Sequence, residues 1–217
     1  MKVYLTARDT LQVLTMARQV REMDGVSQVI IVDCESTFQP LLDGFQELTR
    51  EGFHIVHRPN LGPRAAWEVM PNLNEPYVVS DGDLDLSDCS RSMLIEMRER
   101  LLSNPRLLKV GASLNISDLP DSEIGKQAVR HELKFWSESP DEGRWHPADI
   151  DTTLAVYWQP TWGGYGPAER DGLNQARHVA WYLDPSNLPE DWRHYVSRVT
   201  PERPTHWSSQ IAERRAK

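Results

Sequence analysis

The stretch Val-Ile-Ile-Val-Asp at residues 29–33 decides the fold class of this chain. Four β-branched or aliphatic residues in a row, with no alternation of polarity, are typical of a strand that is buried on both faces, and Asp33 ends the apolar run. Residues 10–23 before it carry apolar side chains at helical spacing and begin with Thr10, a good N-cap residue. The surroundings of this strand therefore indicate an alternation of strands and helices.

The same alternation continues through the first half of the chain. Continuously apolar strands that are separated by helices form parallel sheets covered on both faces. We therefore predict an α/β fold with a mostly parallel central sheet and helices on both faces. The predicted strands are residues 2–6, 29–32, 53–56, 77–80 and 107–116, and the predicted helices are residues 10–23, 38–50, 63–70 and 91–102.

The second half is less regular in its pattern. Seven of the eight tryptophans lie beyond residue 130, so the two halves differ in their packing or in their task. Helices are predicted at residues 123–136 and 189–199, a strand at 152–158, a polar surface loop at 137–149 and a Gly- and Pro-rich connection at 159–172.

Composition excludes several classes of protein. The 217 residues carry a formal net charge of −8, which disfavours a nonspecific nucleic-acid binder because such binding uses surplus Lys and Arg. Two cysteines, Cys34 and Cys89, form no disulfide framework and indicate a reducing compartment. No apolar run approaches the ~18 residues of a membrane span, and the first nine residues do not resemble a signal peptide. We therefore expect a cytoplasmic protein without stable membrane insertion.

Polar residues follow each predicted strand of the first half. In open α/β sheets, ligands bind outside the carboxyl ends of the strands, so these residues are expected to converge on one binding edge. They are Thr6, Arg8 and Asp9 after the first strand, Asp33 after the second, Arg58, Asn60, Gly62 and Arg64 after the third, and Asp81, Asp83 and Asp85 after the fourth.

The acidic turn at residues 81–85, Asp-Gly-Asp-Leu-Asp, is a candidate metal site. Alternating carboxylates on a turn can bind a hard divalent cation, and Mg or Mn shared with a diphosphate needs only one or two of them. A calcium hand does not fit, because its glycine and its bidentate glutamate are replaced by Leu86 and Ser92. The alternative is a polar turn in which Ser87 or Asp88 caps the next helix.

Two common nucleotide motifs are missing from the sequence. No G-x-G-x-x-G follows the first strand and no G-K-[ST] occurs, which disfavours a dinucleotide dehydrogenase and a P-loop NTPase. Asp33 still occupies the position from which an acid contacts a ribose hydroxyl or a base N–H in nucleotide-binding sheets. Its alternative role is simply to end the strand.

Three motifs in this order resemble the nucleotide-sugar half of a GT-A glycosyltransferase, similar to family 2. They are Asp33-Cys34-Glu35-Ser36-Thr37, Asn60-Leu61-Gly62-Pro63-Arg64 and Ser80-Asp81-Gly82-Asp83. The resemblance covers residues 1–120 and implies one GT-A-like domain over residues 1–217, with residues 121–217 binding the acceptor. It implies that Asp33 contacts the nucleoside, that Asp83 holds Mn or Mg on the donor diphosphate, and that Asp81 contacts the ribose or the metal. It also implies that Asn60, Gly62 and Arg64 line the donor pocket.

The catalytic base is not given by the family pattern, since no Glu-Asp pair follows Gly163-Gly164 closely. An inverting transfer needs a carboxylate that deprotonates the acceptor hydroxyl. Asp151 is the first candidate, its alternative being a cap at the start of a strand. Asp191 is the second, its alternative being an acid in the first turn of a helix.

Basic residues late in the chain are candidates for contacts to the diphosphate. Arg177 and His178 can neutralise a leaving group, or belong to a helix that carries a core Trp. His206 is a candidate third metal ligand by resemblance to GT-A enzymes, and its alternative is a structural histidine.

These observations together favour a metal-dependent glycosyltransferase. The expected donor is a UDP- or GDP-sugar and the expected acceptor is a hydroxyl group of a glycan, a small molecule or a hydroxylated DNA base, the last disfavoured by the net charge. The alternatives are a nucleotidyltransferase, disfavoured because no glycine follows the first strand, and a non-catalytic module that binds a nucleotide or a sugar.

Overall fold

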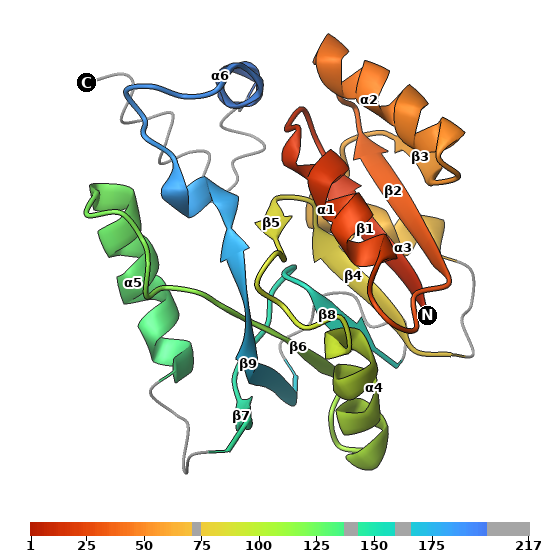
Figure 1. Ribbon diagram of the computed structural model, residues 1–217, viewed down its shortest axis with the longest axis vertical. Helices are drawn as coiled ribbons and strands as arrows, with labels where there is room; N and C mark the ends of the chain where they lie inside the picture. The colour runs from red at the N-terminus through yellow and green to blue at the C-terminus, as the bar shows by residue number, and fades with distance from the viewer. Residues whose placement is uncertain (71–74, 137–142, 159–165, 199–217) are drawn as a thin grey trace.

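A nine-stranded sheet forms the centre of the computed structural model, which describes residues 1–70, 75–136, 143–158 and 166–198 (Figure 1). The strands are β1 (Lys2–Ala7), β2 (Gln28–Cys34), β3 (His54–Arg58), β4 (Tyr77–Asp81), β5 (Leu84–Asp85), β6 (Lys109–Leu114), β7 (Trp145–Pro147), β8 (Ala155–Tyr157) and β9 (Ala168–His178). The α-helices are α1 (Gln12–Arg21), α2 (Gln39–Arg50), α3 (Ala65–Val69), α4 (Met93–Ser103), α5 (Glu123–Trp136) and α6 (Glu190–Ser197), and two short 3-10 helices are η1 (Gly62–Arg64) and η2 (Val179–Tyr182).

The sheet has the order β3-β2-β1-β4-β8-β6-β9-β5, with β7 paired to β9. The first four strands run parallel. Strand β8 is antiparallel to both of its neighbours, β4 and β6, so β6 and its parallel partner β9 run in the direction of β1. The mixed, mostly parallel sheet confirms the predicted α/β fold.

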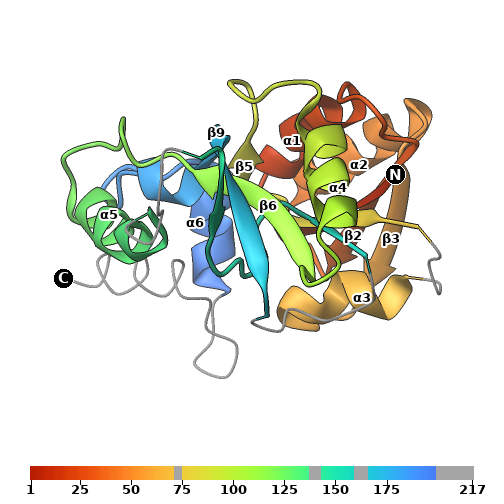
Figure 2. The same ribbon diagram turned by 90° about the horizontal axis from the view of Figure 1, so that it is seen from below.

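Helices cover both faces of the parallel part of the sheet, with α1, α2 and α4 on one side and α3 on the other (Figure 2). Successive side chains of a strand point to opposite faces. Ile31 therefore packs in the core that includes Met16 and Leu41, and its neighbour Ile30 packs in the core that includes Ala66. Burial on both faces explains why residues 29–32 are continuously apolar.

Two segments that we predicted as loops contain strands. Trp145–Pro147, inside the predicted loop 137–149, is strand β7, and residues 168–172 of the predicted connection begin the long strand β9. Strand β9 escapes a pattern search because it has no β-branched residue and places three charged residues in succession. Those charges are buried in ion pairs, which are Glu169 with Arg100, Arg170 with Glu132 and Asp171 with Arg144. Ion-pair partners from distant parts of the sequence therefore allow these residues to form a buried strand, although their own strand propensity is low.

The residues directly before Trp181 are extended, whereas our alternative prediction placed them in a helix. Arg177 and His178 end β9, and only Val179–Tyr182 form a short 3-10 helix, in which Trp181 is buried.

Among the described residues, no helix combines the length and the apolar character that a membrane span requires.

The buried residue Asp9 joins α6 to the loops that follow β1 and β2. Its φ of +59° turns the loop after β1, and its Oδ1 accepts hydrogen bonds from the N–H groups of Thr37 and Phe38 at 2.6 and 3.0 Å. Its Oδ2 lies 2.5 Å from the Arg198 guanidinium, directly after α6. Figure 1 shows α6 beside these loops. Helix α6 is therefore fixed to the carboxyl edge of the sheet.

Replacing Asp9 with alanine is expected to destabilise the protein by about 3–5 kcal/mol, because it leaves a cation and two N–H groups without their buried partner. Denaturant unfolding measures this loss. Asp24→Ala, on an exposed side chain, is the control and is expected to change the free energy of unfolding by less than about 0.5 kcal/mol. A loss of the same small size in Asp9→Ala would contradict the anchoring role.

Candidate active site at the carboxyl edge of the sheet

The strand register brings four polar residues side by side at the carboxyl edge. Thr6 of β1 pairs with Asp81 of β4, and Asp33 of β2 lies opposite Ala7 of β1 and His57 of β3. The predicted convergence of Thr6, Asp33 and Asp81 follows directly from this parallel register.

Asp81 is held between two threonines. Thr6 Oγ1 donates to Asp81 Oδ1 at 3.1 Å, and Thr152 Oγ1 donates to Asp81 Oδ2 at 2.5 Å. Burial, and after it the charge of Asp83, raise the pKa of Asp81 to about 8. Two carboxylates close together in an enclosed place favour either a proton or a cation between them. Asp81 therefore fits a site whose charge is completed by a cation.

Asp83 points one carboxylate oxygen into the protein without satisfying it. No donor within the described chain reaches Asp83 Oδ1, which is buried. Its Oδ2 lies 3.7 Å from Nε2 of His178, because β5 pairs with β9 and sets Leu84 opposite His178. The His178 ring stacks on Trp181 with 5.0 Å between ring centroids. A buried polar atom without a hydrogen-bond partner needs an explanation, and a bound ion or water is one of the known explanations.

Gly82 is required by the close packing of the acidic turn. A Cβ at this position would lie 2.6 Å from the Thr6 carbonyl oxygen and 2.8 Å from Val13 Cγ2. Contacts this short are prohibitive, so only glycine lets the turn between Asp81 and Asp83 lie against β1 and α1.

The side chains near Asp83 offer the ligand chemistry of a hard divalent cation. Carboxylate oxygens suit Mg and Mn, and the His178 imidazole lies beside them as a further nitrogen donor. In the parts of the chain that are described, no group of three His, Cys, Asp or Glu side chains is already arranged to hold a metal ion. Asp81, Asp83 and His178 therefore offer at most a partial set of donors for such an ion.

Asp33 lies at the end of β2 with its carboxylate almost completely buried. Its Oδ1 accepts the N–H of Ser36 at 3.1 Å, and its Oδ2 lies 2.8 Å from Nδ1 of His57. The His57 ring is exposed and covers this carboxylate. We assigned His57 no role from the sequence, since the register that pairs β2 with β3 is needed to see it.

Arg8 places a positive charge at the same edge. Its Nε is buried, and no acceptor in the described residues bonds to it. The guanidinium is near enough to Cys34 to lower the pKa of that thiol, although burial dominates and raises it to about 12. Arg8 is therefore a cation for which an anionic ligand is the natural partner.

The turn after β3 is built by local hydrogen bonding. Asn60 Oδ1 accepts the N–H of Gly62 at 3.0 Å, and Gly62 has a φ of +63°, which favours glycine. Arg64 is exposed at the start of α3. The turn explains Asn60 and Gly62 structurally, and their predicted contact with a donor stays a prediction.

Asp151 precedes β8 and is exposed at the site. Its Oδ1 accepts the N–H of Thr153 at 3.2 Å. The adjacent Thr152 bonds to Asp81, and the charge of Asp151 is one of the causes that raise the pKa of Asp81. The structure thus brings the first candidate base to the acidic turn.

Three predicted site residues have their side chains engaged elsewhere. Asp85 accepts hydrogen bonds from Gln19 and Ser87. Arg177 pairs with Asp88 and Asp118. Asp191 is buried and accepts the N–H of Leu11 at 2.8 Å, before α1. His206 lies outside the described residues.

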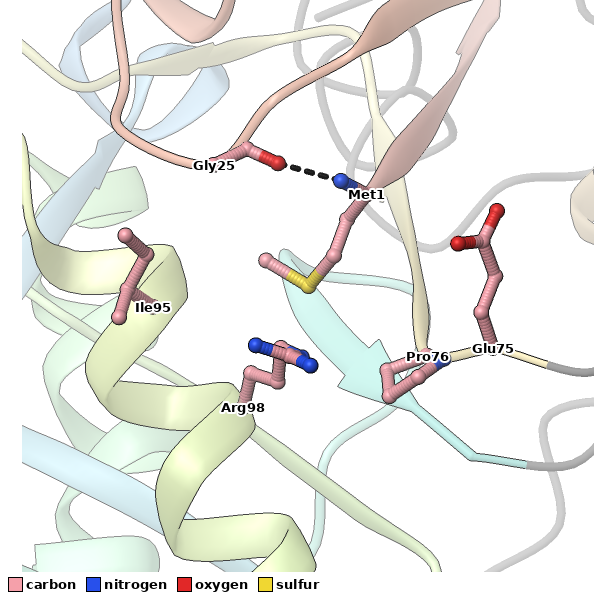
Figure 3. Close-up of a pocket in the computed structure, with 6 residues that line it drawn as sticks. All are labelled: Met1, Gly25, Glu75, Pro76, Ile95 and Arg98. Atoms are coloured by element: carbon pink, nitrogen blue, oxygen red, sulfur yellow. Dashed lines mark hydrogen bonds between the residues drawn. The ribbon is translucent and has the colours of Figure 1, made fainter.

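A separate hollow of about 260 Å³ lies at the other end of the strands, near the amino-terminal ends of β1 and β4 (Figure 3). Its lining residues are Met1, Gly25, Glu75, Pro76, Ile95 and Arg98. The Met1 amino group donates to the Gly25 carbonyl across its rim. The hollow contains none of the predicted site residues.

Comparison with solved structures identifies the fold. The chain is similar to S. aureus TarS 1–349, with a TM-score of 0.51 and 12% identity over 99% of this chain and 70% of that one. It is also similar to CMP:2-keto-3-deoxy-manno-octonic acid synthetase complexed with CTP, with a TM-score of 0.43 and 12% identity, covering 73% of this chain and 64% of the synthetase. No known protein-family profile matches the chain, and no curated protein matches its sequence.

These comparisons define the class of fold. TarS is a GT-A-like glycosyltransferase, and the chain has this nucleotide-sugar-transferase-like fold, as the ordered motifs after the second, third and fourth strands predicted. At 12% identity, the likeness to TarS shows the fold alone.

Proposed function

We propose that this protein is a metal-dependent glycosyltransferase that moves a sugar from a nucleotide-sugar donor to a hydroxyl acceptor. The observation that carries the proposal is the unsatisfied Asp83 carboxylate beside Asp81 and His178, on the same sheet edge as Asp33. Uncompensated acidic groups and a nucleotide-binding edge in one place are what a donor diphosphate with its cation needs.

The donor half of the site is assigned to the ends of β1, β2 and β4. Asp33, oriented by His57, accepts a hydrogen bond from the base or the ribose. Arg8 pairs with the phosphates, since its Nε has no acceptor among the described residues. Thr6 holds Asp81 in place.

The cation is assigned to Asp83, with Asp81 and His178 beside it. When bound, Mn or Mg offsets the charge that builds on the departing diphosphate. His178 takes the place that we gave to His206, because it is the imidazole 3.7 Å from the Asp83 carboxylate. Asp85 is not assigned to the cation, because Gln19 and Ser87 bind both of its oxygens, whereas Asp83 keeps Oδ1 without a partner among the described residues.

Asp151 is assigned to the acceptor. Its exposed carboxylate adjoins the acidic turn through Thr152, and a base must lie within hydrogen-bond reach of the hydroxyl that it deprotonates. The proposed acceptor is any hydroxyl compound that can reach this exposed side of the site.

Asp33→Ala is expected to weaken the binding of the donor nucleotide about 5- to 150-fold, since an unpaired hydrogen-bonding partner costs ~1–3 kcal/mol. Calorimetric titration of UDP and GDP in the presence of Mn measures the change. Asp43→Ala, on the outer face of α2, is the matched control and should leave the affinity unaltered. Equal affinities for wild type and Asp33→Ala would remove Asp33 from the site.

A nucleotidyltransferase is separated from this proposal by its products. It would release pyrophosphate from a nucleoside triphosphate, whereas a glycosyltransferase releases a nucleoside diphosphate from a nucleotide sugar. The loop after β1 favours the second reaction, because it contains no glycine and its Asp9 is committed to Arg198.

A further inference from the structure

Two buried cations hold the backbone directly before Asp151. Lys109, the first residue of β6, is 1% exposed, and its Nζ donates to the carbonyl of Ile150. Arg170 of β9 is 2% exposed, and its Nε donates to the carbonyl of Asp149 at 2.9 Å. Two consecutive carbonyls therefore each receive a hydrogen bond from a charged side chain, and such bonds are stronger than those between neutral groups.

The charge of Lys109 is costly where it lies. Burial, the largest effect, lowers its pKa, and the carboxylates of Asp151 and Asp149 act against this effect. The hydrogen-bond acceptor of Nζ is a backbone carbonyl and not a carboxylate. An apolar side chain of the same volume would avoid the cost of burying the charge, but it would leave the Ile150 carbonyl without its donor. What the lysine adds over an apolar residue is therefore its hold on this carbonyl.

The other side of the segment 149–153 is bound to the acidic turn. Thr152 Oγ1 donates to Asp81 Oδ2, and the N–H of Asp81 donates to the carbonyl of Thr152 at 2.9 Å. The Asp151 carboxylate accepts the N–H of Thr153. The segment is therefore a bridge between the buried cations and the edge of the sheet.

The segment 149–153 and the adjoining Leu154 pack closely against β6 at Gly111. A Cβ at Gly111 would lie 2.7 Å from the Leu154 carbonyl oxygen and 2.9 Å from Ile150 Cδ1. The missing side chain lets the backbone around Asp151 approach the sheet closely enough for Lys109 to reach it.

We propose that Lys109 and Arg170 are positioning residues that fix Asp151 relative to Asp81. The inference rests on the proposed function, in which Asp151 activates the acceptor. A displacement of a catalytic group by about 1 Å can reduce a rate about 100-fold. Holding both carbonyls before Asp151 with buried charges restricts such displacements.

Lys109→Met keeps the length and volume of the side chain and removes its hydrogen bond to Ile150. Hydrogen exchange, followed by mass spectrometry on peptides that cover residues 148–154, is expected to become about tenfold faster in this variant. The melting temperature is expected to change little, because the removal of a buried charge offsets the loss of the donor to the Ile150 carbonyl. Arg170→Lys, which keeps a charge beside Glu132 but loses the Nε–H, is expected to accelerate exchange in the same peptides.

Arg100→Met is the matched control. It removes the ion pair with Glu169, which adjoins Arg170 in β9, and leaves Asp149 and Ile150 untouched. This variant is expected to lower the melting temperature and to leave exchange at residues 148–154 unchanged. A role of Lys109 in stability alone would give the same result as this control.

Turnover is measured as hydrolysis of UDP-glucose and GDP-mannose with Mn present. Lys109→Met is expected to lower kcat about 10- to 100-fold and to leave the donor KM unchanged.

Unchanged exchange at residues 148–154 overturns the proposal whatever the activity. Faster exchange with an unchanged kcat overturns the catalytic consequence of positioning. If exchange is faster in Lys109→Met but the wild type binds and hydrolyses neither donor, Lys109 keeps its structural role and the proposed function is overturned.

Discussion

Asp83→Asn is expected to abolish turnover while the fold stays intact. The substitution keeps the shape of the side chain and removes its negative charge. This charge faces His178 through Oδ2, and Oδ1 is buried without a hydrogen-bond partner. Without this carboxylate the site loses its main cation ligand, and the charge on the departing diphosphate is no longer offset. Release of nucleoside diphosphate and the melting temperature, measured on the same preparation, test both parts of the expectation.

Asp85→Asn is the informative comparison for Asp83→Asn. It makes the same chemical change two residues away, where the carboxylate accepts hydrogen bonds from Gln19 and Ser87. We expect it to lose stability and to keep its turnover. EDTA is expected to inactivate the wild type, with recovery on adding Mn. Full activity in EDTA, or loss of turnover in Asp85→Asn alone, would contradict the assignment of the cation to Asp83.

Asp151→Asn is expected to lower kcat by ~10²–10⁴, the usual contribution of general-base catalysis, with donor affinity nearly unchanged. The reason is its exposed carboxylate beside the acidic turn, on a segment held by Thr152 and by backbone hydrogen bonds. Steady-state kinetics with varied donor separates kcat from KM.

Asp191→Ala is the matched test of the second candidate base. Its carboxylate is buried and accepts the N–H of Leu11, so removing it leaves a donor unpaired and costs about 1–3 kcal/mol of stability. We expect a lower melting temperature and a normal kcat. An active Asp151→Asn together with an inactive, stably folded Asp191→Ala would transfer the role to Asp191. If both variants stay active, a retaining mechanism without a dedicated base explains the chemistry better.

The first half of the fold could be predicted because its information is local. The run at residues 29–32 is buried on both faces, so its composition alone identifies a strand of a covered sheet. The motifs at the carboxyl edge of the sheet could be predicted for the same reason. Parallel strands place the residues that follow Thr6, Asp33 and Ser80 side by side at that edge. Sequence position is then nearly equivalent to position in space.

The second half could not be predicted because its information is non-local. Strand β9 is polar in sequence and becomes buried only because Arg100, Glu132 and Arg144 supply partners from other elements. Lys109 lies inside the predicted strand 107–116, and the sequence does not show its hydrogen bond to Ile150, which is 41 residues away.

The candidate site divides in the same way. Asp33, Asp81 and Asp83 could be located from motifs, whereas Asp85 and Asp191 could not be separated from them by residue type. All five are acids next to a strand or a helix. Only the structure shows that Asp83 keeps one carboxylate oxygen without a partner among the described residues, whereas both oxygens of Asp85 accept hydrogen bonds.

The most direct test of the central claim is a calorimetric titration of UDP, GDP, CDP and TDP into the wild type and into Asp83→Asn, each with and without Mn. A ligand at ~100-fold its dissociation constant also adds ~2.7 kcal/mol of stability, which a thermal shift confirms independently. We predict that at least one nucleoside diphosphate binds the wild type, that it binds more tightly with Mn, and that Asp83→Asn loses the Mn-dependent part. Failure of all four nucleotides to bind the wild type with Mn present would contradict the assignment of this site to a nucleotide-sugar donor.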